Sequence, residues 1–171
     1  SLGRHAAVLT TVSPAIYRLA IADGKVAFED WDPTAPFPRG ALGEIRAGHR
    51  ISILPLVGCI GPCGPKISRV LDDEAGRRAH VEALVGLVAA DRSDGIFVDY
   101  EDVDAKPASV TAFYRELGAA LHARGAKLGV ALQEVALDGG GEEQGDHAVH
   151  VGGAFGREAQ RLIRPLHQAP P

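Results

Sequence analysis

The chain has 171 residues, of which 46% are hydrophobic and 23% are charged, and this length predicts one domain, with at most an added tail. Its 18 Lys and Arg against 22 Asp and Glu give a formal net charge of −4, which argues against nucleic acid as the main partner because phosphate binding needs a dense basic face. The sequence predicts neither a membrane span nor a signal peptide. Because it begins at Ser1 and contains no methionine, we expect a processed or excised piece.

Short apolar segments rich in Val, Ile and Leu are predicted to form strands. In chain order they are Ala6–Val12, Ile51–Val57, Gly95–Tyr100 and Leu128–Leu132. Nearly unbroken apolar runs of this length are typical of strands that are covered on both faces of a parallel sheet. Pro55 lacks the amide proton that a strand interior uses, so the second strand is expected to be weakest in its middle.

Amphipathic segments between these strands are predicted to form helices. In Asp72–Ala90, valine and leucine recur at helical spacing after an acidic start that suits the positive end of a helix. In Ser109–Arg124 an apolar stripe follows Ser109, a residue type that commonly caps helices, and Gly125 stands where the helix is expected to end. A shorter helix is expected over Ala41–Ala47. The alternation of strands and helices predicts an α/β fold with right-handed crossovers.

The C-terminal part of the sequence differs in character. Asp138–Gly153 is glycine-rich and acidic without periodicity, which predicts a loop or disorder, and a helical stretch over Phe155–Arg164 precedes Pro165. We therefore divide the chain into a domain over residues 1–137 and a loop with a helical tail over residues 138–171. His147 and His150 lie near acidic residues there, but a solvated loop is preferred to a metal site.

The most informative segment is Asp94–Asp104, in which five of the eleven residues are acidic. Because successive side chains of a strand alternate, Phe97, Asp99 and Glu101 are expected on one face and an apolar set with Tyr100 on the other, under helices. The first face carries two carboxylates to the C-terminal end of the strand, where parallel α/β folds bind ligands. One of two neighbouring carboxylates can stay protonated and act as a general acid. A solvated acidic loop before the next helix explains the pattern equally well.

The segment Asp94-Gly95-Ile96-Phe97-Val98-Asp99-Tyr100-Glu101 resembles the signature of family 18 glycoside hydrolases, the chitinase-like enzymes: Asp-x-x-Asp-x-Asp-x-Glu at the end of the fourth barrel strand. Leu9–Leu19 with Asp23-Gly24 is similar to the second strand of the spore-envelope branch of that family, Ile51–Gly58 to the third strand, and Ala112–Val130 to the helix and strand after the signature. The resemblance implies an incomplete (β/α)8 TIM-type barrel of about four parallel units that match strands two to five, because a closed barrel takes about 250 residues. The first strand, and the sixth with its Met-x-Tyr-Asp-like motif, have no counterpart.

The resemblance also implies a function, the hydrolysis of β-1,4-linked N-acetylglucosamine glycans (chitin or peptidoglycan-like) by a substrate-assisted retaining mechanism. Glu101 would be the general acid, and Asp99 would orient the substrate's N-acetyl group, whose oxygen attacks the anomeric carbon. Asp94 would be structural, with Tyr100 as a further supporting residue. Phe97 replaces the middle Asp of the signature, which in the family shares a proton with the next one. The alternative is a catalytically weak or inactive glycan-binding or structural remnant, favoured by Phe97 and by the missing strands.

Four residues are expected to line a sugar cleft: Ser13, Tyr17, Gly58 and Trp31. The Trp31 ring would stack on a sugar, although a lone Trp in a Pro-rich loop is as often a hydrophobic plug. The expected partner is an N-acetylglucosamine-containing polysaccharide; no cofactor, metal, nucleic acid or membrane is expected. Self-association is expected through the strand edges that an open barrel exposes. A secreted or cell-envelope location is suggested by the family resemblance alone.

Cys59 and Cys63 flank a Gly-Pro turn after the second predicted strand. A local disulfide requires that their Cα atoms approach within about 7 Å. A metal site would need further ligands, and none is spaced nearby. The sequence therefore leaves a disulfide and free thiols as open alternatives and disfavours a metal.

Overall fold

The computed structural model describes residues 9–38, 43, 51–131 and 148–149. Its elements follow in the order β1 (Thr11–Val12), β2 (Ala15–Ala22), β3 (Lys25–Asp30), β4 (Ser52–Ile53), β5 (Leu56–Cys59), the 3-10 helix η3 (Gly61–Cys63), α2 (Gly64–Asp72), α3 (Glu74–Asp91), β6 (Gly95–Tyr100), α4 (Pro107–His122), β7 (Lys127–Ala131) and β8 (Ala148–Val149). None of the described helices is long and apolar enough to cross a membrane.

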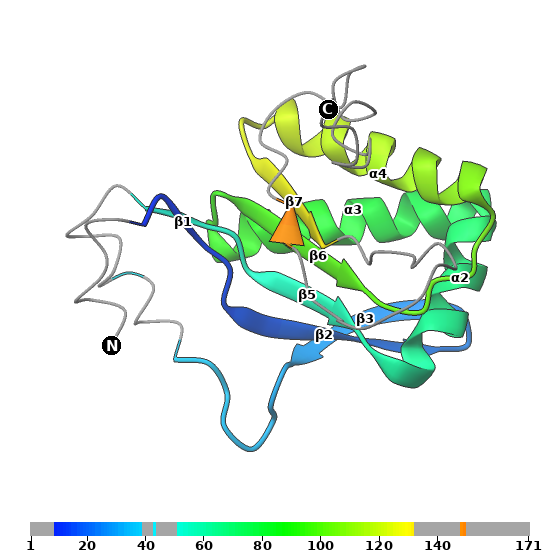
Figure 1. The fold of residues 1–171 in the computed structure, drawn as a ribbon, viewed down its shortest axis with the longest axis horizontal. Helices are drawn as coiled ribbons and strands as arrows, with labels where there is room; N and C mark the ends of the chain where they lie inside the picture. Colours follow the sequence, from blue (N-terminus) through cyan, green and yellow to red (C-terminus); the bar gives the residue numbers. More distant parts are fainter. Residues whose placement is uncertain (1–8, 39–42, 44–50, 132–147, 150–171) are drawn as a thin grey trace, which may run out of the picture.

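One six-stranded sheet, in the order β3-β2-β5-β6-β7-β8, forms the centre of the molecule (Figure 1). Strands β2, β5, β6 and β7 are parallel neighbours, whereas β3 and β8 are antiparallel to β2 and β7. Across the described residues the sheet stays open, with β3 and β8 as its edges. The structure therefore confirms an α/β fold with parallel strands, while the assignment of these strands to positions two to five of a barrel stays a prediction.

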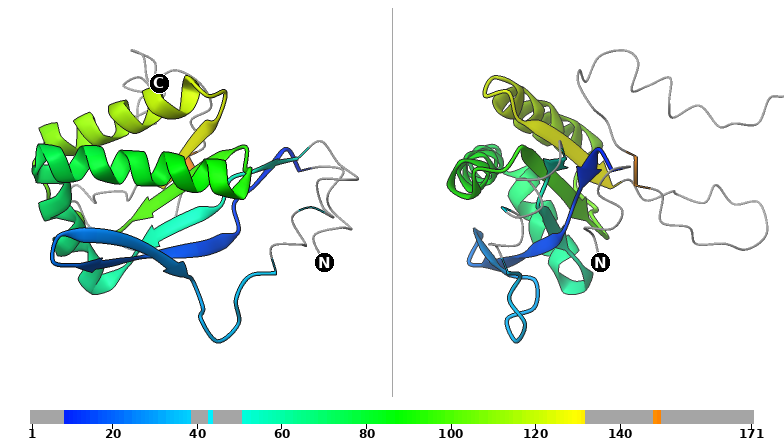
Figure 2. Two further views of the ribbon diagram at one scale, coloured as in Figure 1. Left: turned by 180° about the vertical axis from the view of Figure 1, so that it is seen from behind. Right: turned by 90° about the vertical axis from the view of Figure 1, so that its left-hand side faces the viewer.

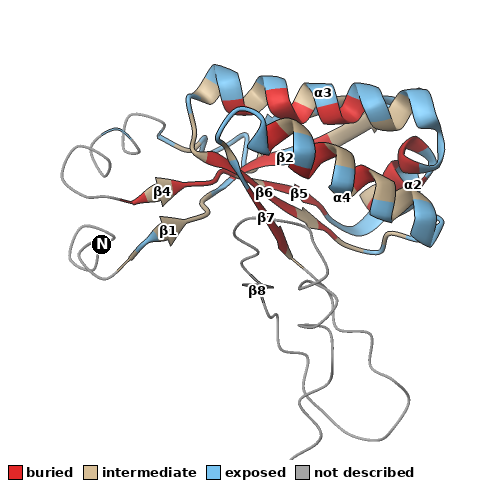
Figure 3. Cartoon of the chain, turned by 90° about the horizontal axis from the view of Figure 1, so that it is seen from above, coloured by how far each residue is buried: buried red, intermediate tan, exposed pale blue. Residues whose placement is uncertain are grey.

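The helices cover one face of this sheet. Figures 1 and 2 show α3 and α4 side by side over it, and α2 packs against both at the end where the parallel strands finish. Seen from above, buried residues line the helices on the side that faces the sheet (Figure 3). In α3 these include the predicted stripe Val81, Leu84, Val85 and Val88. The opposite face of the sheet is thereby left without helices from the described part of the chain.

The first strand begins later than the sequence predicted. Of the described residues in Ala6–Val12, Thr11–Val12 form a strand and Leu9 and Thr10 do not, while residues 6–8 lie outside the described part. The longer strand is β2, which turns back through Asp23 and Gly24, with φ of 51° and 72°, into β3. Two successive residues with positive φ are the mark of a tight hairpin turn, for which Asp-Gly is a preferred sequence. The hairpin explains why no crossover helix directly follows β2.

Prolines interrupt the two N-terminal parallel strands at matching positions. Pro14 separates β1 from β2, and Pro55 separates β4 from β5, as expected for the middle of Ile51–Val57. The hydrogen-bond ladder continues across both breaks, because the amide of Leu54 donates to the carbonyl of Val12 and the amide of Leu56 to that of Pro14. Each pair is thus one strand in space that changes direction at its proline.

Two of the helix predictions, Asp72–Ala90 and Ser109–Arg124, are confirmed in place and corrected in their ends. Asp72–Ala90 corresponds to α3, which Asp73 caps by accepting a hydrogen bond from the Gly76 amide at 2.7 Å. α4 begins at Pro107 with Lys106 as its N-cap, three residues before the predicted cap Ser109, because proline suits the first helical position. α2 was not predicted, and β8 lies inside the predicted loop Asp138–Gly153. Apart from Gly43, the predicted helices Ala41–Ala47 and Phe155–Arg164 lie outside the described residues.

Candidate active site

The alternation along β6 divides its side chains as the sequence predicted. On the helix-covered face, the Tyr100 hydroxyl is hydrogen-bonded to Nε2 of His80 on α3 at 2.8 Å, and its ring stacks on Phe113 of α4. Asp99 alternates with Tyr100 and is paired in register with Gly58 of β5. Asp99 therefore lies on the open face, near the C-terminal end of the parallel strands.

Glu101 is the first residue after β6. Its amide donates to the carbonyl of Cys59 at 2.9 Å, so the ladder between β5 and β6 extends to this residue. The next residue, Asp102, has a φ of 54°, and the chain turns sharply there. Glu101 thus stands at the rim of the sheet, two residues beyond Asp99, with its amide held by β5.

Asp94 lies at the opposite end of β6. Its carboxylate accepts a hydrogen bond from the Ile53 amide at 2.8 Å, and its own amide donates to the Ile53 carbonyl at 3.0 Å. It therefore fastens the start of β6 to β4, far along the strand from Asp99.

Two aromatic rings of the open face lie over glycines of neighbouring strands. An ideal Cβ at Gly58 would come within 2.3 Å of the Trp31 ring, and one at Gly129 of β7 within 2.5 Å of the Phe97 ring. The amide of Trp31 donates to the Ile16 carbonyl at 2.8 Å, which places this residue beside the start of β2. Phe97 is only 7% exposed. The absence of a side chain at each glycine is what admits each ring.

A cavity of about 590 Å³ opens next to Trp31, at the C-terminal ends of β2 and β5. Its walls come from the β2–β3 hairpin, from β5 and from the start of α2. Arg18 of β2 and Glu29 of β3 form an ion pair at 2.8 Å on its wall, and Lys66 of α2 adds a further positive charge. Asp99 and Glu101 do not line this cavity, but Gly58, the register partner of Asp99, does.

Of the four residues predicted to line a sugar cleft, the structure brings Gly58 and Trp31 together. Tyr17 points to the other face: its hydroxyl donates to the Asp91 carboxylate of α3 at 2.6 Å, and the residue is 3% exposed. Its register partner is Val57, which is fully buried in the hydrophobic core. Ser13 lies in the break between β1 and β2 and is not part of the cavity wall.

The cavity residues Arg18, Glu29 and Lys66 were not predicted from the sequence. The first two belong to the unpredicted hairpin, and the third to the unpredicted α2. The signal for the hairpin was present, since Asp-Gly is a preferred turn sequence and Asp23-Gly24 stands between two segments that contain β-branched and aromatic residues. Recognition of that turn would have paired Arg18 with Glu29 directly across the two strands.

Burial controls the titration of the groups beneath the site. It lowers the pKa of His80 to about 4, and it raises the pKa of Tyr100 well above its ordinary value, with a smaller contribution from Tyr114. Burial, and secondarily the charge of Asp99, raises the pKa of Tyr114 to about 12. At neutral pH these groups are therefore uncharged, and the field of Asp99 reaches α4.

Of the two alternatives for the cysteines, the structure has the disulfide: Cys59 and Cys63 are bonded, with Cα atoms 5.3 Å apart. Nowhere among the described residues do three or more His, Cys, Asp or Glu side chains gather as they would around a metal ion.

The structure is similar to solved glycosidases. A chitinase from Chromobacterium violaceum matches 78% of this chain with a TM-score of 0.62 and 26% identity, and a class V chitinase from Pseudomonas fluorescens matches 77% with 0.60 and 26%. A glycoside hydrolase family 18 N-acetylglucosaminidase from Paenibacillus barengoltzii matches 75% with 0.59 and 23%. The chain has a chitinase-like fold of glycoside hydrolase family 18.

This chitinase-like fold is partial, because the chain spans 39–42% of the length of those three structures. Neither a family model nor a curated protein matches the sequence. The fold therefore rests on the structural similarity, and the local resemblance of Asp94–Glu101 to the family signature agrees with it.

Proposed function

We propose that this chain provides the acid-bearing part of a glycosidase that hydrolyses β-1,4-linked N-acetylglucosamine glycans, chitin or peptidoglycan-like. Glu101 is the general acid, and Asp99 orients the N-acetyl group of the substrate. The observation that carries the proposal is the position of Asp99: near the C-terminal end of a parallel strand, on the helix-free face, paired in register with Gly58 under Trp31. In parallel α/β folds this end of the sheet is where ligands bind.

The chemistry needs only one proton donor from the protein. Glu101 delivers its proton to the glycosidic oxygen as the bond to the anomeric carbon breaks, and the N-acetyl oxygen of the substrate forms the new bond to that carbon. Glu101, now a carboxylate, then takes a proton from the water that opens the cyclic intermediate. Two inversions at one carbon give retention of configuration. Asp99 holds the N-acetyl group in the attacking orientation.

Trp31 supplies the apolar surface that a sugar ring requires. Its ring is half-buried over Gly58 and borders the cavity, so one part is fixed by the strand while the rest is accessible. The polar groups nearby, Arg18, Glu29 and Lys66, offer hydrogen bonds to sugar hydroxyls. An aromatic platform with a few polar groups is a usual composition for a small-molecule site.

One observation favours the alternative function, a remnant that binds glycans without turnover. Phe97 stands where the family signature has a second buried Asp, and its ring is packed against Gly129. A phenyl ring cannot exchange a proton with Asp99, so the coupling between two carboxyl groups is lost. In this alternative Trp31 and its cavity remain functional while catalysis is weak or absent.

Hydrolysis of a chitooligosaccharide of defined length by the wild-type chain and by Glu101→Gln tests the proposal. We expect the substitution to lower the rate by about 10²–10⁴-fold with binding retained, because the amide keeps the shape of the acid but cannot deliver a proton. Glu82→Gln, on the exposed side of α3, is the matched control and should leave the rate unchanged. Equal turnover by wild type and Glu101→Gln would show that Glu101 is not the acid.

The same assay separates the two functions. If the wild-type chain binds the oligosaccharide but releases no sugar, and if Trp31→Ala abolishes that binding, the chain has the remnant function. In that case Phe97→Asp should raise the rate above zero, at some cost in stability from burying a carboxyl group.

A further inference from the structure

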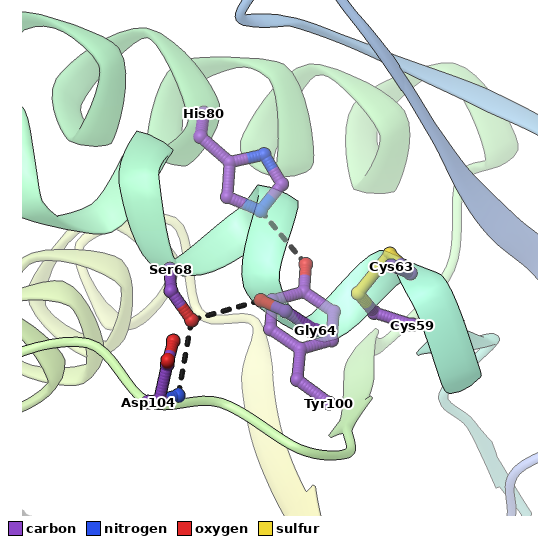
Figure 4. Close-up of a disulfide and its surroundings, with 7 residues drawn as sticks. All are labelled: Cys59, Cys63, Gly64, Ser68, His80, Tyr100 and Asp104. Carbon is purple, nitrogen blue, oxygen red and sulfur yellow. Dashed lines mark hydrogen bonds between the residues drawn. A yellow bond between two sulfur atoms is a disulfide. The ribbon is translucent and has the colours of Figure 1, made fainter.

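The start of α2 is fastened to the strand that precedes it. Cys59 is the last residue of β5, Cys63 is the residue before α2, and the disulfide closes the short turn between them (Figure 4). Cys59 is 1% exposed, so its end of the bridge is anchored in the core. The first turn of α2 therefore has a fixed position relative to the C-terminal end of the sheet.

This fixed turn touches the backbone on either side of the Glu101–Asp102 peptide. The carbonyl of Cys59 accepts the hydrogen bond from the Glu101 amide at 2.9 Å. An ideal Cβ at Gly64 would lie 2.5 Å from the carbonyl oxygen of Asp102 and 2.7 Å from that of Glu101. Both neighbours are backbone atoms, so no side chain fits at position 64 unless the segment with Glu101 moves.

Ser68, one turn further along α2, completes the contact. Its hydroxyl donates to the carbonyl of Gly64 at 2.8 Å and accepts from the amide of Asp104 at 3.0 Å (Figure 4). Ser68 is 4% exposed, so water does not compete for these bonds. Thr111 of α4 makes the same bond to the carbonyl four residues earlier, but on an exposed helix surface. The bond to Asp104 is what distinguishes Ser68.

We propose that the Cys59–Cys63 disulfide, Gly64 and Ser68 are positioning residues that fix the backbone of residues 101–104 and thereby the direction of the Glu101 side chain. The inference rests on the proposed role of Glu101 as the acid. Proton delivery to a glycosidic oxygen tolerates little displacement, because a misplacement of about 1 Å can cost about 100-fold in rate. The sharp turn at Asp102 would let Glu101 swing if nothing held both flanks.

Ser68→Ala is the direct test, with Thr111→Ala as the matched control. We expect the Asp104 amide of Ser68→Ala to exchange its hydrogen about two- to tenfold faster, since a net hydrogen bond is lost. We expect kcat on a chitooligosaccharide to fall about tenfold with KM unchanged, because binding at Trp31 does not depend on the acid. Thr111→Ala should change neither quantity.

Gly64→Ala and the double variant Cys59→Ala/Cys63→Ala extend the test to the other positioning residues. Each should speed exchange at the Glu101 amide and lower kcat more than KM. Gly86→Ala is the control for the glycine, because an ideal Cβ at Gly86 meets nothing within 4 Å. If one of these variants fails to fold, the test rests on Ser68→Ala, which removes a single oxygen atom.

The outcomes separate this inference from the proposed function. Faster exchange at Asp104 with a selective fall in kcat supports both. If Ser68→Ala speeds exchange at Asp104 but the wild type has no turnover, the positioning contact is supported and the proposed glycosidase activity is contradicted. Unchanged exchange in Ser68→Ala overturns the positioning inference even if the wild type is an active enzyme. The inference also fails if Thr111→Ala lowers KM and kcat in the same way as Ser68→Ala.

Discussion

The two faces of the central sheet are built from the same strands but differ in what their aromatic residues contact. On the helix-covered face, His80, Tyr100 and Phe113 stack on one another, and each is buried. On the open face, Trp31 and Phe97 each lie over a glycine of a neighbouring strand. Interlocking rings resist any change in volume, whereas the half-buried Trp31 ring keeps part of its surface beside the cavity. The difference gives the first face a role in stability, and under the proposed function it leaves recognition to the second.

The largest effect is expected from Phe113→Ala on the helix-covered face. Phe113 is fully buried and contacts His80, Tyr100 and Tyr114, so its truncation leaves a cavity that the rigid stack cannot fill. We expect a loss of about 3–5 kcal/mol in the free energy of unfolding, measured by urea denaturation. A loss below about 1 kcal/mol would show that the stack rearranges freely, and the contrast between the faces would disappear.

Acidification should weaken the same face. His80 has a pKa of about 4 in the folded chain against 6.5 for the free side chain, because burial disfavours its charged form. Above pH 6.5 the group contributes no pH dependence, and as the pH falls toward 4 the unfolded chain gains a proton that the folded chain does not. We expect stability to drop by about 3 kcal/mol over this interval. His80→Gln should flatten that part of the stability profile; an unchanged profile would contradict the assignment.

A smaller effect is expected from Gly58→Ala on the open face. The new methyl group would overlap the Trp31 ring, so the ring must leave the strand, at a cost of about 1–3 kcal/mol. Trp31 is the sole tryptophan of the sequence, so tryptophan fluorescence reports on the surroundings of this ring. We expect an emission shift to longer wavelength. Gly86→Ala is the control, and an identical spectrum for Gly58→Ala would mean that the ring does not depend on that glycine.

The smallest effect is expected from the ion pair of Arg18 and Glu29. Both side chains are about half exposed, at 50% and 48%, so water screens the attraction. A double-mutant cycle with Arg18→Gln and Glu29→Gln should give a coupling below about 1 kcal/mol in stability. Sugar affinity should respond more than stability, if the pair serves the cavity. A larger effect on stability than on sugar affinity would show that this pair stabilises the fold instead.

The sequence predicted best what depends on local geometry. The separation of Asp99 from Tyr100 follows from the alternation of any strand, and the apolar stripe of α3 follows from helical spacing, so both were accessible without a structure. Ser109 was mistaken for a helix cap because its side chain suits that role, while Pro107, which fixes the backbone of the first turn, decided the start.

The candidate site was less predictable because it joins segments that are distant in the sequence. Trp31 meets Gly58 across 27 positions, and Gly64 of the unpredicted α2 meets the Glu101–Asp102 backbone. Tyr17 was expected at a sugar cleft, yet it lies on the helix-covered face. The pairing of β2 with β5 is irregular just before it, between Ala15 and Tyr17. A bulge of this kind shifts the alternation by one residue, and no pattern in the sequence located it.

The outermost strand of the hairpin, β3, has a consequence for how the protein behaves at high concentration. A sheet edge offers unpaired backbone groups on which a second molecule can add a strand, and such growth ends in fibrils or precipitate. β3 carries Lys25, Glu29 and Asp30 within six residues, and Lys25 and Glu29 are exposed. An approaching copy would have to strip water from these charges. This edge is therefore a poor template for further strands, so the expected self-association through strand edges is disfavoured at β3.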